Sequence, residues 1–360
     1  MSISGNGLCF FIALICPCLP ALAQSTPSKP AEQRPREAAP PQFTPVSVEN
    51  DSSHAKATIE KHALALLSAQ KYSELDALAE DFRKSRVCFE DGTWKLNLFY
   101  QAVSDLGTEA RENDWEARLT LLRRWFEKDT ECITPRVAIA RALVGYAWHA
   151  RGNRWASEVP KDALNPVSER VNEAYRILEA ARALPEKCPG WYSAWMKMAM
   201  LAGTNREQYD QVFEEGLKSF PSYTPLYFSK TWYLLERWYG KRGEWESFAA
   251  NSANTLGGEE GDIVYAQIVW YVHDSRFFGN PIKESAVEWP RVQRGFEAIR
   301  RRYPNSIFAL SEYCAISGFA PTNARQRMRS LFAEIGNRAD LRVWRTMESF
   351  QRDHNWACSD

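Results

Sequence analysis

Histidine and acidic residues are the side chains of this sequence that could carry metal or acid–base chemistry. No two histidines lie three or four residues apart, so no local pair is spaced for one metal ion. The chain also has no H-E-x-x-H, G-x-S-x-G, EF-hand or phosphate-loop pattern. The sequence therefore predicts no catalytic residue, no metal site and no cofactor. The histidines are His54, His62, His149, His273 and His354.

Two acidic motifs could suggest a metal site or a catalytic acid. Residues 257–262, GGEEGD, could attract a cation, but they lack the alternating ligands of a calcium loop. A helix stop at the glycines followed by a new helix start explains them more simply. Glu312, between Ser311 and Tyr313, resembles a glycosidase acid only superficially, because that chemistry needs a positioned carboxyl with a raised pKa. We expect Glu312 to be solvated.

Aromatic and basic residues could instead form a surface for a partner. Trp155 is a large side chain to leave without contacts in the polar loop 152–165. Residues 221–240 hold more aromatic rings than one buried stripe accommodates, namely Tyr223, Tyr227, Phe228, Trp232, Tyr233, Trp238 and Tyr239. The alternative is that these rings pack against neighbouring helices. Arginine enrichment in 291–345 is a weaker candidate for an acidic partner. The predicted partner-binding residues are Arg154, Trp155, Tyr227, Lys230 and Tyr239.

These residues must be positioned by helices. From Ala55 onward, apolar residues recur at spacings of three and four, and alternating strand-like runs are nearly absent, which predicts an all-α fold of about fifteen helices. Expected boundaries include Asn165-Pro166 and a capping box at Thr204. The crowded stretch DGTWKLNLFY, 91–100, is expected to turn the chain and then bury its large residues in the core.

Four junctions repeat weakly along the chain. Each combines an amphipathic helix, a proline-bearing turn and an aromatic-rich helix, as in FEEGLKSFPSYTPLYFSKTWYLL. This pattern predicts a tetratricopeptide-like array of helical hairpins, an α-solenoid. The part from about residue 289 fits less clearly and could be a distinct helical cap.

The first 49 residues read as a targeting segment and a linker. Residues 1–23 hold an apolar run from Leu8 to Cys16 and end in Ala21-Leu22-Ala23, which predicts a signal peptide cleaved after Ala23. Residues 24–49 are proline-rich and predict a disordered linker, so the helical domain is expected over 50–360. We therefore expect a bacterial protein that is periplasmic or secreted, with no integral membrane segment after cleavage. A cytoplasmic scaffold with a false signal is the alternative.

Five cysteines follow the predicted cleavage site, and none are spaced as C-x-x-C. Cys88, Cys132 and Cys188 fall at hairpin junctions and are expected along one edge of the array. Cys132 could there form a disulfide with Cys88 or Cys188. The sequence leaves open whether any disulfide forms among Cys88, Cys132, Cys188, Cys314 and Cys358.

Longer motifs carry a resemblance to a known family. LLSAQKYSELDALAEDFRKSRVCFEDGTWKLNLFYQAV, YTPLYFSKTWYLLERWYGKRGEWESFA and GGEEGDIVYAQIVW together resemble the bacterial family called domain of unknown function 4034, over about Thr58 to Tyr271. The resemblance implies a helical repeat protein, often exported, with no established activity or catalytic residues.

Charge balance limits the partners. Lysine plus arginine equals aspartate plus glutamate at 45 each, so no global field favours nucleic acid. We predict an exported, non-catalytic scaffold that binds a protein or peptide along its concave face. The alternative is a helical cell-envelope enzyme, for example one acting on a glycan, with an acidic pair distant in sequence.

Overall fold

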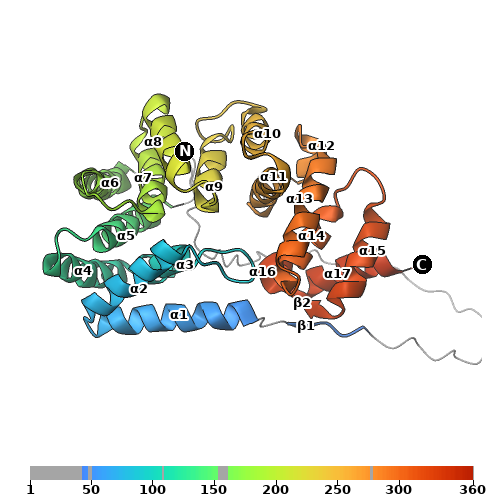
Figure 1. The fold of residues 1–360 in the computed structure, drawn as a ribbon, viewed down its shortest axis with the longest axis horizontal. Helices are drawn as coiled ribbons and strands as arrows, with labels where there is room; N and C mark the ends of the chain where they lie inside the picture. Colours follow the sequence, from blue (N-terminus) through green and yellow to red (C-terminus); the bar gives the residue numbers. More distant parts are fainter. Residues whose placement is uncertain (1–42, 48–50, 108, 153–160, 276–278, 360) are drawn as a thin grey trace, which may run out of the picture.

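The computed structural model describes residues 43–47, 51–107, 109–152, 161–275 and 279–359, and these form an all-α array (Figure 1). The predicted fold class is confirmed. Two of its seventeen helices have only four residues each, which leaves the fifteen longer helices expected from periodicity. The helices are α1 (Asp51–Ser68), α2 (Tyr72–Ser85), α3 (Lys95–Ser104), α4 (Glu112–Lys128), α5 (Ile133–Arg151), α6 (Lys161–Arg182), α7 (Pro189–Ala202), α8 (Arg206–Ser219), α9 (Thr224–Tyr233), α10 (Glu244–Leu256), α11 (Gly258–Asp274), α12 (Pro281–Glu284), α13 (Trp289–Arg302), α14 (Ile307–Ser317), α15 (Ala324–Ile335), α16 (Leu341–Trp344) and α17 (Met347–Cys358).

Two expected helix boundaries differ from the structure. α6 begins at Lys161, so Pro166 lies inside the helix and does not open it. The cap of α8 is Asn205, whose side chain accepts a hydrogen bond from the Gln208 N–H, and not the neighbouring Thr204. At α8 the helix uses the residue next to the predicted cap.

The packing order follows the hairpins. We call α3, α5, α7, α9, α11 and α14 the inner series, because each packs against the next and they lie inside the curve in Figure 1. α4, α6, α8 and α10 each pack on the inner helix that follows. The array continues past Trp289, since α13 packs along α11. The tetratricopeptide-like solenoid remains a prediction beyond this packing order.

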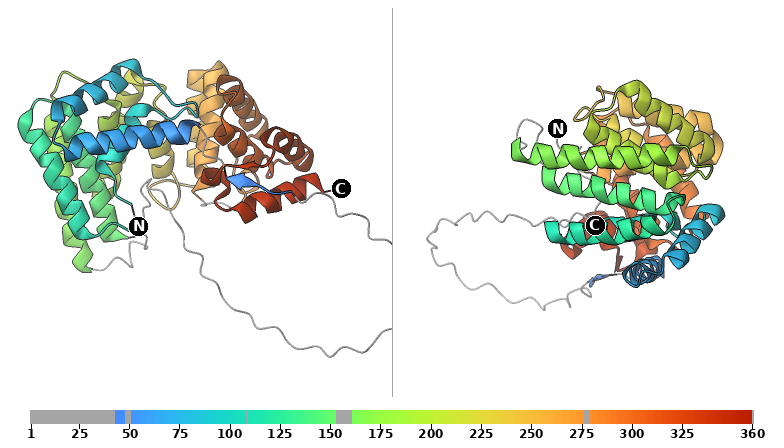
Figure 2. Two further views of the ribbon diagram at one scale, coloured as in Figure 1. Left: turned by 90° about the horizontal axis from the view of Figure 1, so that it is seen from below. Right: turned by 90° about the vertical axis from the view of Figure 1, so that its left-hand side faces the viewer.

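The two ends of the array meet. β1 (Val46–Ser47) pairs in parallel with β2 (Arg338–Ala339), and Figures 1 and 2 show that α1 begins on the side of the C-terminal helices and runs away from them. Phe43 stacks on His354 with ring centroids 3.6 Å apart. Residues 43–47 fall in the segment expected to be a linker, so ordered packing begins before Asn50. The predicted signal peptide and residues 24–42 lie outside the described residues.

The stretch that crowds large residues after Asp91 joins these ends. Trp94 is 4% exposed and Phe99 is fully buried, so the packing interpretation of DGTWKLNLFY is confirmed. The Trp94 Nε1–H donates to the Ser222 carbonyl at 3.2 Å, across 128 residues of sequence. The left-handed Gly92 lies so close to Tyr303 that an added Cβ would be 3.2 Å from its ring. The loop therefore connects the N-terminal hairpins to the segment before α9, at Ser222, and to the end of α13, at Tyr303.

Glycine permits the closest helix contact. A Cβ on Gly295 of α13 would lie 2.1 Å from the Asp262 carbonyl oxygen of α11 and 2.6 Å from the Ala266 Cβ. Such distances exclude any side chain, so the two helix backbones touch directly at this point. None of the helices in the described ranges combines the length and apolarity needed to cross a bilayer.

Candidate ligand-binding groups on the inner helices

The predicted partner-binding residues are mostly enclosed. Tyr227 is 2% exposed and its hydroxyl donates to the Pro221 carbonyl at 2.9 Å. Lys230 is 4% exposed and pairs with Asp210. Tyr239 is partly buried, and its hydroxyl donates to the Met200 carbonyl at 2.7 Å. Arg154 and Trp155 lie outside the described residues.

Burial favours the packing alternative for the aromatic rings of residues 221–240. α9 is covered by α7, α8, α10 and α11, so rings that wrap around more than one face still find helices to pack against. Of the seven aromatic side chains singled out there, only Phe228 and Tyr239 keep partial exposure. The packing alternative therefore describes this segment.

The two charge-rich sequence features neutralise each other. Asp262 accepts hydrogen bonds from Arg291 at 3.0 Å and Arg294 at 2.7 Å. The two glutamates of the same motif pair with Arg301 and Arg302. The carboxylates of GGEEGD thus hold α13 against α11, and the arginines expected to attract an acidic partner are used within the chain. No group of histidine, cysteine and acidic side chains in the described part of the chain could hold a metal ion.

The cysteines in the described residues are all free thiols. The Cys188 thiol lies 3.3 Å from the Tyr100 hydroxyl, and the Cys132 thiol donates to Asp76 at 3.2 Å. Burial raises the pKa of Cys132 to about 11, despite partly opposing hydrogen bonds from Thr134, so it is a weak nucleophile.

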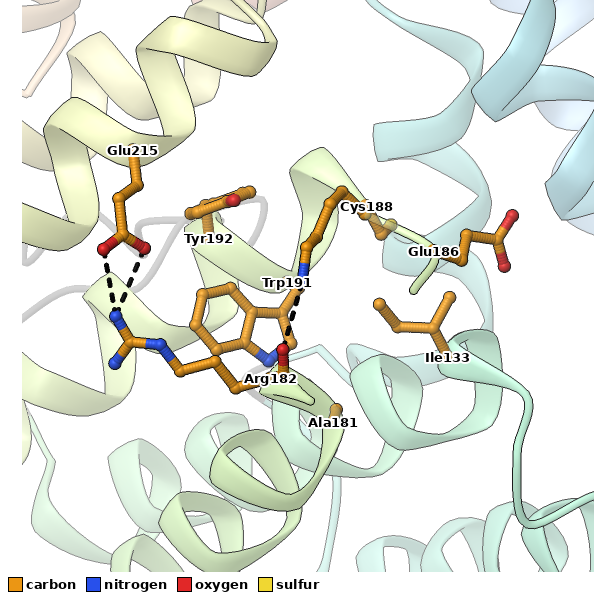
Figure 3. A pocket seen from close by; sticks show the side chains of 9 residues that line it. Ile133, Ala181, Arg182, Glu186, Cys188, Trp191, Tyr192 and Glu215 are labelled. Atoms are coloured by element: carbon orange, nitrogen blue, oxygen red, sulfur yellow. Dashed lines mark hydrogen bonds and ion pairs between the residues drawn. The ribbon is translucent and has the colours of Figure 1, made fainter. Parts of the chain in front are cut away.

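A pocket of about 170 Å³ opens at the turn between α6 and α7 (Figure 3). Its charged groups already have partners: Arg182 donates to both Glu215 oxygens at 3.1 and 3.2 Å, and Lys187 donates to two backbone carbonyls. Glu186 pairs with Arg83. The pocket therefore presents no unpaired charge to a ligand.

Lys197 on α7 is different. It is half-buried, and among the described residues its ammonium has no hydrogen-bond or ion-pair partner. Burial and, after it, the charge of the Arg141 guanidinium lower the pKa of Lys197 to about 8, against the opposing charge of Asp105. An ammonium held in this state destabilises the fold, which is the usual signature of a group kept for binding or catalysis.

Glu312 on α14 is the acidic counterpart. It too is half-buried and without a hydrogen-bond or ion-pair partner within the described residues. Burial raises its pKa well above the ordinary value, the charges of Asp91 and Asp274 raise it further, and Arg342 opposes them. Glu312 therefore differs from the ordinary solvated carboxyl that we expect from the sequence, since it is half-buried on the inner series and its pKa is raised.

Asp91 lies near Glu312 but is fully engaged. Its side chain has no exposure, and it accepts from Lys56 at 2.5 Å, Arg342 at 3.1 Å and the Thr93 N–H at 3.1 Å. Burial raises the pKa of Asp91, but Lys56 and Thr93 outweigh it and hold the pKa below its ordinary value. Asp91 is thus an enclosed structural anion, and it offers no second accessible carboxyl beside Glu312.

Comparison with family models, curated protein sequences and solved structures gave no match. The resemblance to domain of unknown function 4034 therefore remains a prediction. Sequence reasoning missed Lys197, although a signal exists: it is the one charged residue in the run 190–202, GWYSAWMKMAMLA. A lone lysine there must either reach solvent at a helix edge or stay desolvated, and only the fold decides which.

Proposed function

We propose that this chain is an exported helical-array protein that binds a protein or peptide partner without catalysis. The observation that carries the proposal is the pair of unpaired, desolvated groups, Lys197 and Glu312, on two helices of the inner series. A peptide carries hydrogen-bonding and charged groups that could pair with both side chains. Its carboxylates pair with an ammonium, and its amide N–H groups or basic side chains pair with a carboxyl.

The helices between these two groups offer contact area. α9 and α11 lie between α7 and α14 in the packing order, and each contributes a partly exposed ring, Phe228 and Tyr271, stacked at 4.7 Å. Rigid aromatic rings give large contact area at little loss of conformational freedom. Export is supported by the apolar run and the Ala21-Leu22-Ala23 sequence, and it places the partner in the periplasm or outside the cell.

A peptide array tests this function. Wild-type protein is applied to immobilised hexapeptides of acidic, basic, aromatic and neutral composition. We expect retention of a defined class, weakened at least about tenfold by Lys197→Met or Glu312→Gln. The matched controls Lys218→Met and Glu214→Gln change exposed residues and leave retention unchanged. Failure of the wild-type protein to retain any peptide at about 1 mM contradicts the proposal.

Glu312 also supports a second candidate, a glycan-active enzyme. Its raised pKa suits a general acid, and Asp274, whose charge acts on it, is exposed and paired with Arg345. The test is release of reducing sugar from cell-wall glycan by wild type and by Glu312→Gln. Release that Glu312→Gln abolishes supports the enzyme, whereas equal or absent release by both proteins removes it.

A further inference from the structure

The surroundings of Lys197 contain more positive than negative charge. Arg141 on α5 donates to Asp105 at 3.2 Å and to the Asn97 side-chain oxygen at 3.3 Å. Only Asp105 opposes the two cations that share this site, and its side chain is 24% exposed. Lys197 and Arg141 therefore leave one positive charge without a counterion.

Arg118 on α4 adds further positive charge near Asp105. Its guanidinium donates to the Ala102 and Val103 carbonyls at the end of α3, at 3.0 and 2.9 Å, and Asp105 follows directly. It therefore brings a third cation near the same carboxylate. The groups from every helix packed around Asp105 sum to an excess of positive charge.

A second observation points to a missing partner. Arg141 is 6% exposed, yet its Nε has no hydrogen-bond acceptor among the described residues. A buried guanidinium nitrogen without an acceptor destabilises the fold, since each such donor loses its water and gains nothing. The Arg141 Nε and the Lys197 ammonium thus both lack an acceptor, and the charge of Arg141 acts on Lys197.

We propose that Lys197 and Arg141 form a binding site for a carboxylate group of a peptide, an inference that rests on the proposed function and names the ligand chemistry. A carboxylate brings negative charge and acceptor oxygens to a place where Lys197, Arg141 and Arg118 face one carboxylate, Asp105. The carboxylate comes either from an acidic side chain or from the C-terminus.

The charge of Lys197 predicts how binding depends on pH. An anion binds the protonated ammonium, so affinity falls as the pH rises through about 8. Binding in turn raises the pKa of Lys197. The charged groups acting on Lys197 are those of Arg141 and Asp105.

Four probes separate the sources. They are acetate, acetyl-Ala-Ala-Glu-Ala-Ala-amide, acetyl-pentaalanine with a free C-terminus, and acetyl-pentaalanine amide as the neutral control. Lysine side chains are labelled by reductive ¹³C-methylation, and the NMR signal of Lys197 is assigned from its loss in Lys197→Met. Calorimetric titration measures affinity for wild type, Lys197→Met and the exposed control Lys218→Met.

We expect acetate and one carboxylate peptide to raise the pKa of Lys197 by at least one unit. That peptide binds at least tenfold more weakly to Lys197→Met and with unchanged affinity to Lys218→Met. Preference for the glutamate peptide identifies an acidic side chain, and preference for the free acid identifies a C-terminus. Either result supports the carboxylate site.

Three outcomes distinguish the ways to fail. Equal binding of the neutral and carboxylate peptides, unaffected by Lys197→Met, overturns the carboxylate site and leaves the peptide-binding function standing. Acetate that raises the Lys197 pKa while no peptide binds supports the site and overturns the peptide-binding function. No response to any of the four probes overturns both.

Discussion

At the scale of single residues, the inner helices hold two groups that the fold does not satisfy. Lys197 and Glu312 are half-buried without partners, whereas the enclosed Asp91 has three donors. Removing an unpaired buried charge relieves a penalty, and removing one partner of an engaged charge creates one. The two kinds of site therefore respond in opposite directions to mutation.

Replacing Lys197 by methionine is expected to stabilise the protein by about 1 to 3 kcal/mol at pH 7. The unfolded chain keeps this proton up to about pH 10.5 and the folded chain up to about pH 8. Between these values the unfolded state holds more protons, so wild-type stability rises with pH and the advantage of the variant shrinks. Urea unfolding at pH 7 and pH 9.5 checks this, and an advantage that stays constant or grows refutes it.

Glu312→Gln is expected to show the opposite pH trend. The folded state keeps the Glu312 proton above the ordinary pKa of 4.5, where the unfolded state has lost it. Wild-type stability therefore falls as the pH rises through that range, and the variant gains by about 1 to 2 kcal/mol at pH 7 but nothing near pH 4. The exposed Glu214→Gln serves as control, and a variant less stable than wild type at pH 7 contradicts the argument.

At the scale of elements, backbone contact between α11 and α13 depends on glycine. Gly295→Ala would place a methyl group 2.1 Å from a backbone oxygen, so we expect a loss of about 1 to 3 kcal/mol even though alanine favours helix. Gly107→Ala is the matched control, because no atom lies within 4 Å of its Cβ position. Equal melting temperatures for the two variants would show that the helices separate without penalty.

The elements were also the part most open to prediction. Apolar spacing of three and four gave the helices and the buried face of α3, including Trp94 and Phe99, because each depends on local sequence. The partner-binding residues were harder. Tyr227 and Lys230 read as surface from one helix alone, and four neighbouring helices enclose them. Lys197 and Glu312 acquire their properties from helices far away in sequence.

At the scale of the whole molecule, the ends of the array are joined. In an open repeat array each unit contacts only its neighbours. Here Arg342 of α16 donates to Asp91 across 251 residues and to Asp340 at 2.6 Å, and β1 pairs with β2. These contacts connect the N-terminal helices directly to the C-terminal ones.

Arg342→Met is expected to destabilise the closure by about 2 kcal/mol, because it leaves the enclosed Asp91 with a single cation. Amide hydrogen exchange should speed up at Phe89 and Lys95, whose N–H groups donate within the connecting loop. Arg294→Met removes a pair at a 60% exposed arginine and should change stability by less than about 1 kcal/mol. Unchanged exchange in Arg342→Met would mean that the ends are held by other contacts.

The central claim is that the inner helices keep Lys197 and Glu312 unpaired in order to bind a peptide. The most direct test is the melting temperature of wild type and of the Lys197→Met/Glu312→Gln double variant, each with and without the peptide that the wild-type protein prefers, either acetyl-Ala-Ala-Glu-Ala-Ala-amide or acetyl-pentaalanine with a free C-terminus. The account predicts that the double variant melts several degrees higher without peptide and does not respond to it, while saturating peptide raises the wild-type midpoint by about 2 to 8 °C. A double variant that melts below wild type, or one that responds equally to the peptide, would contradict it.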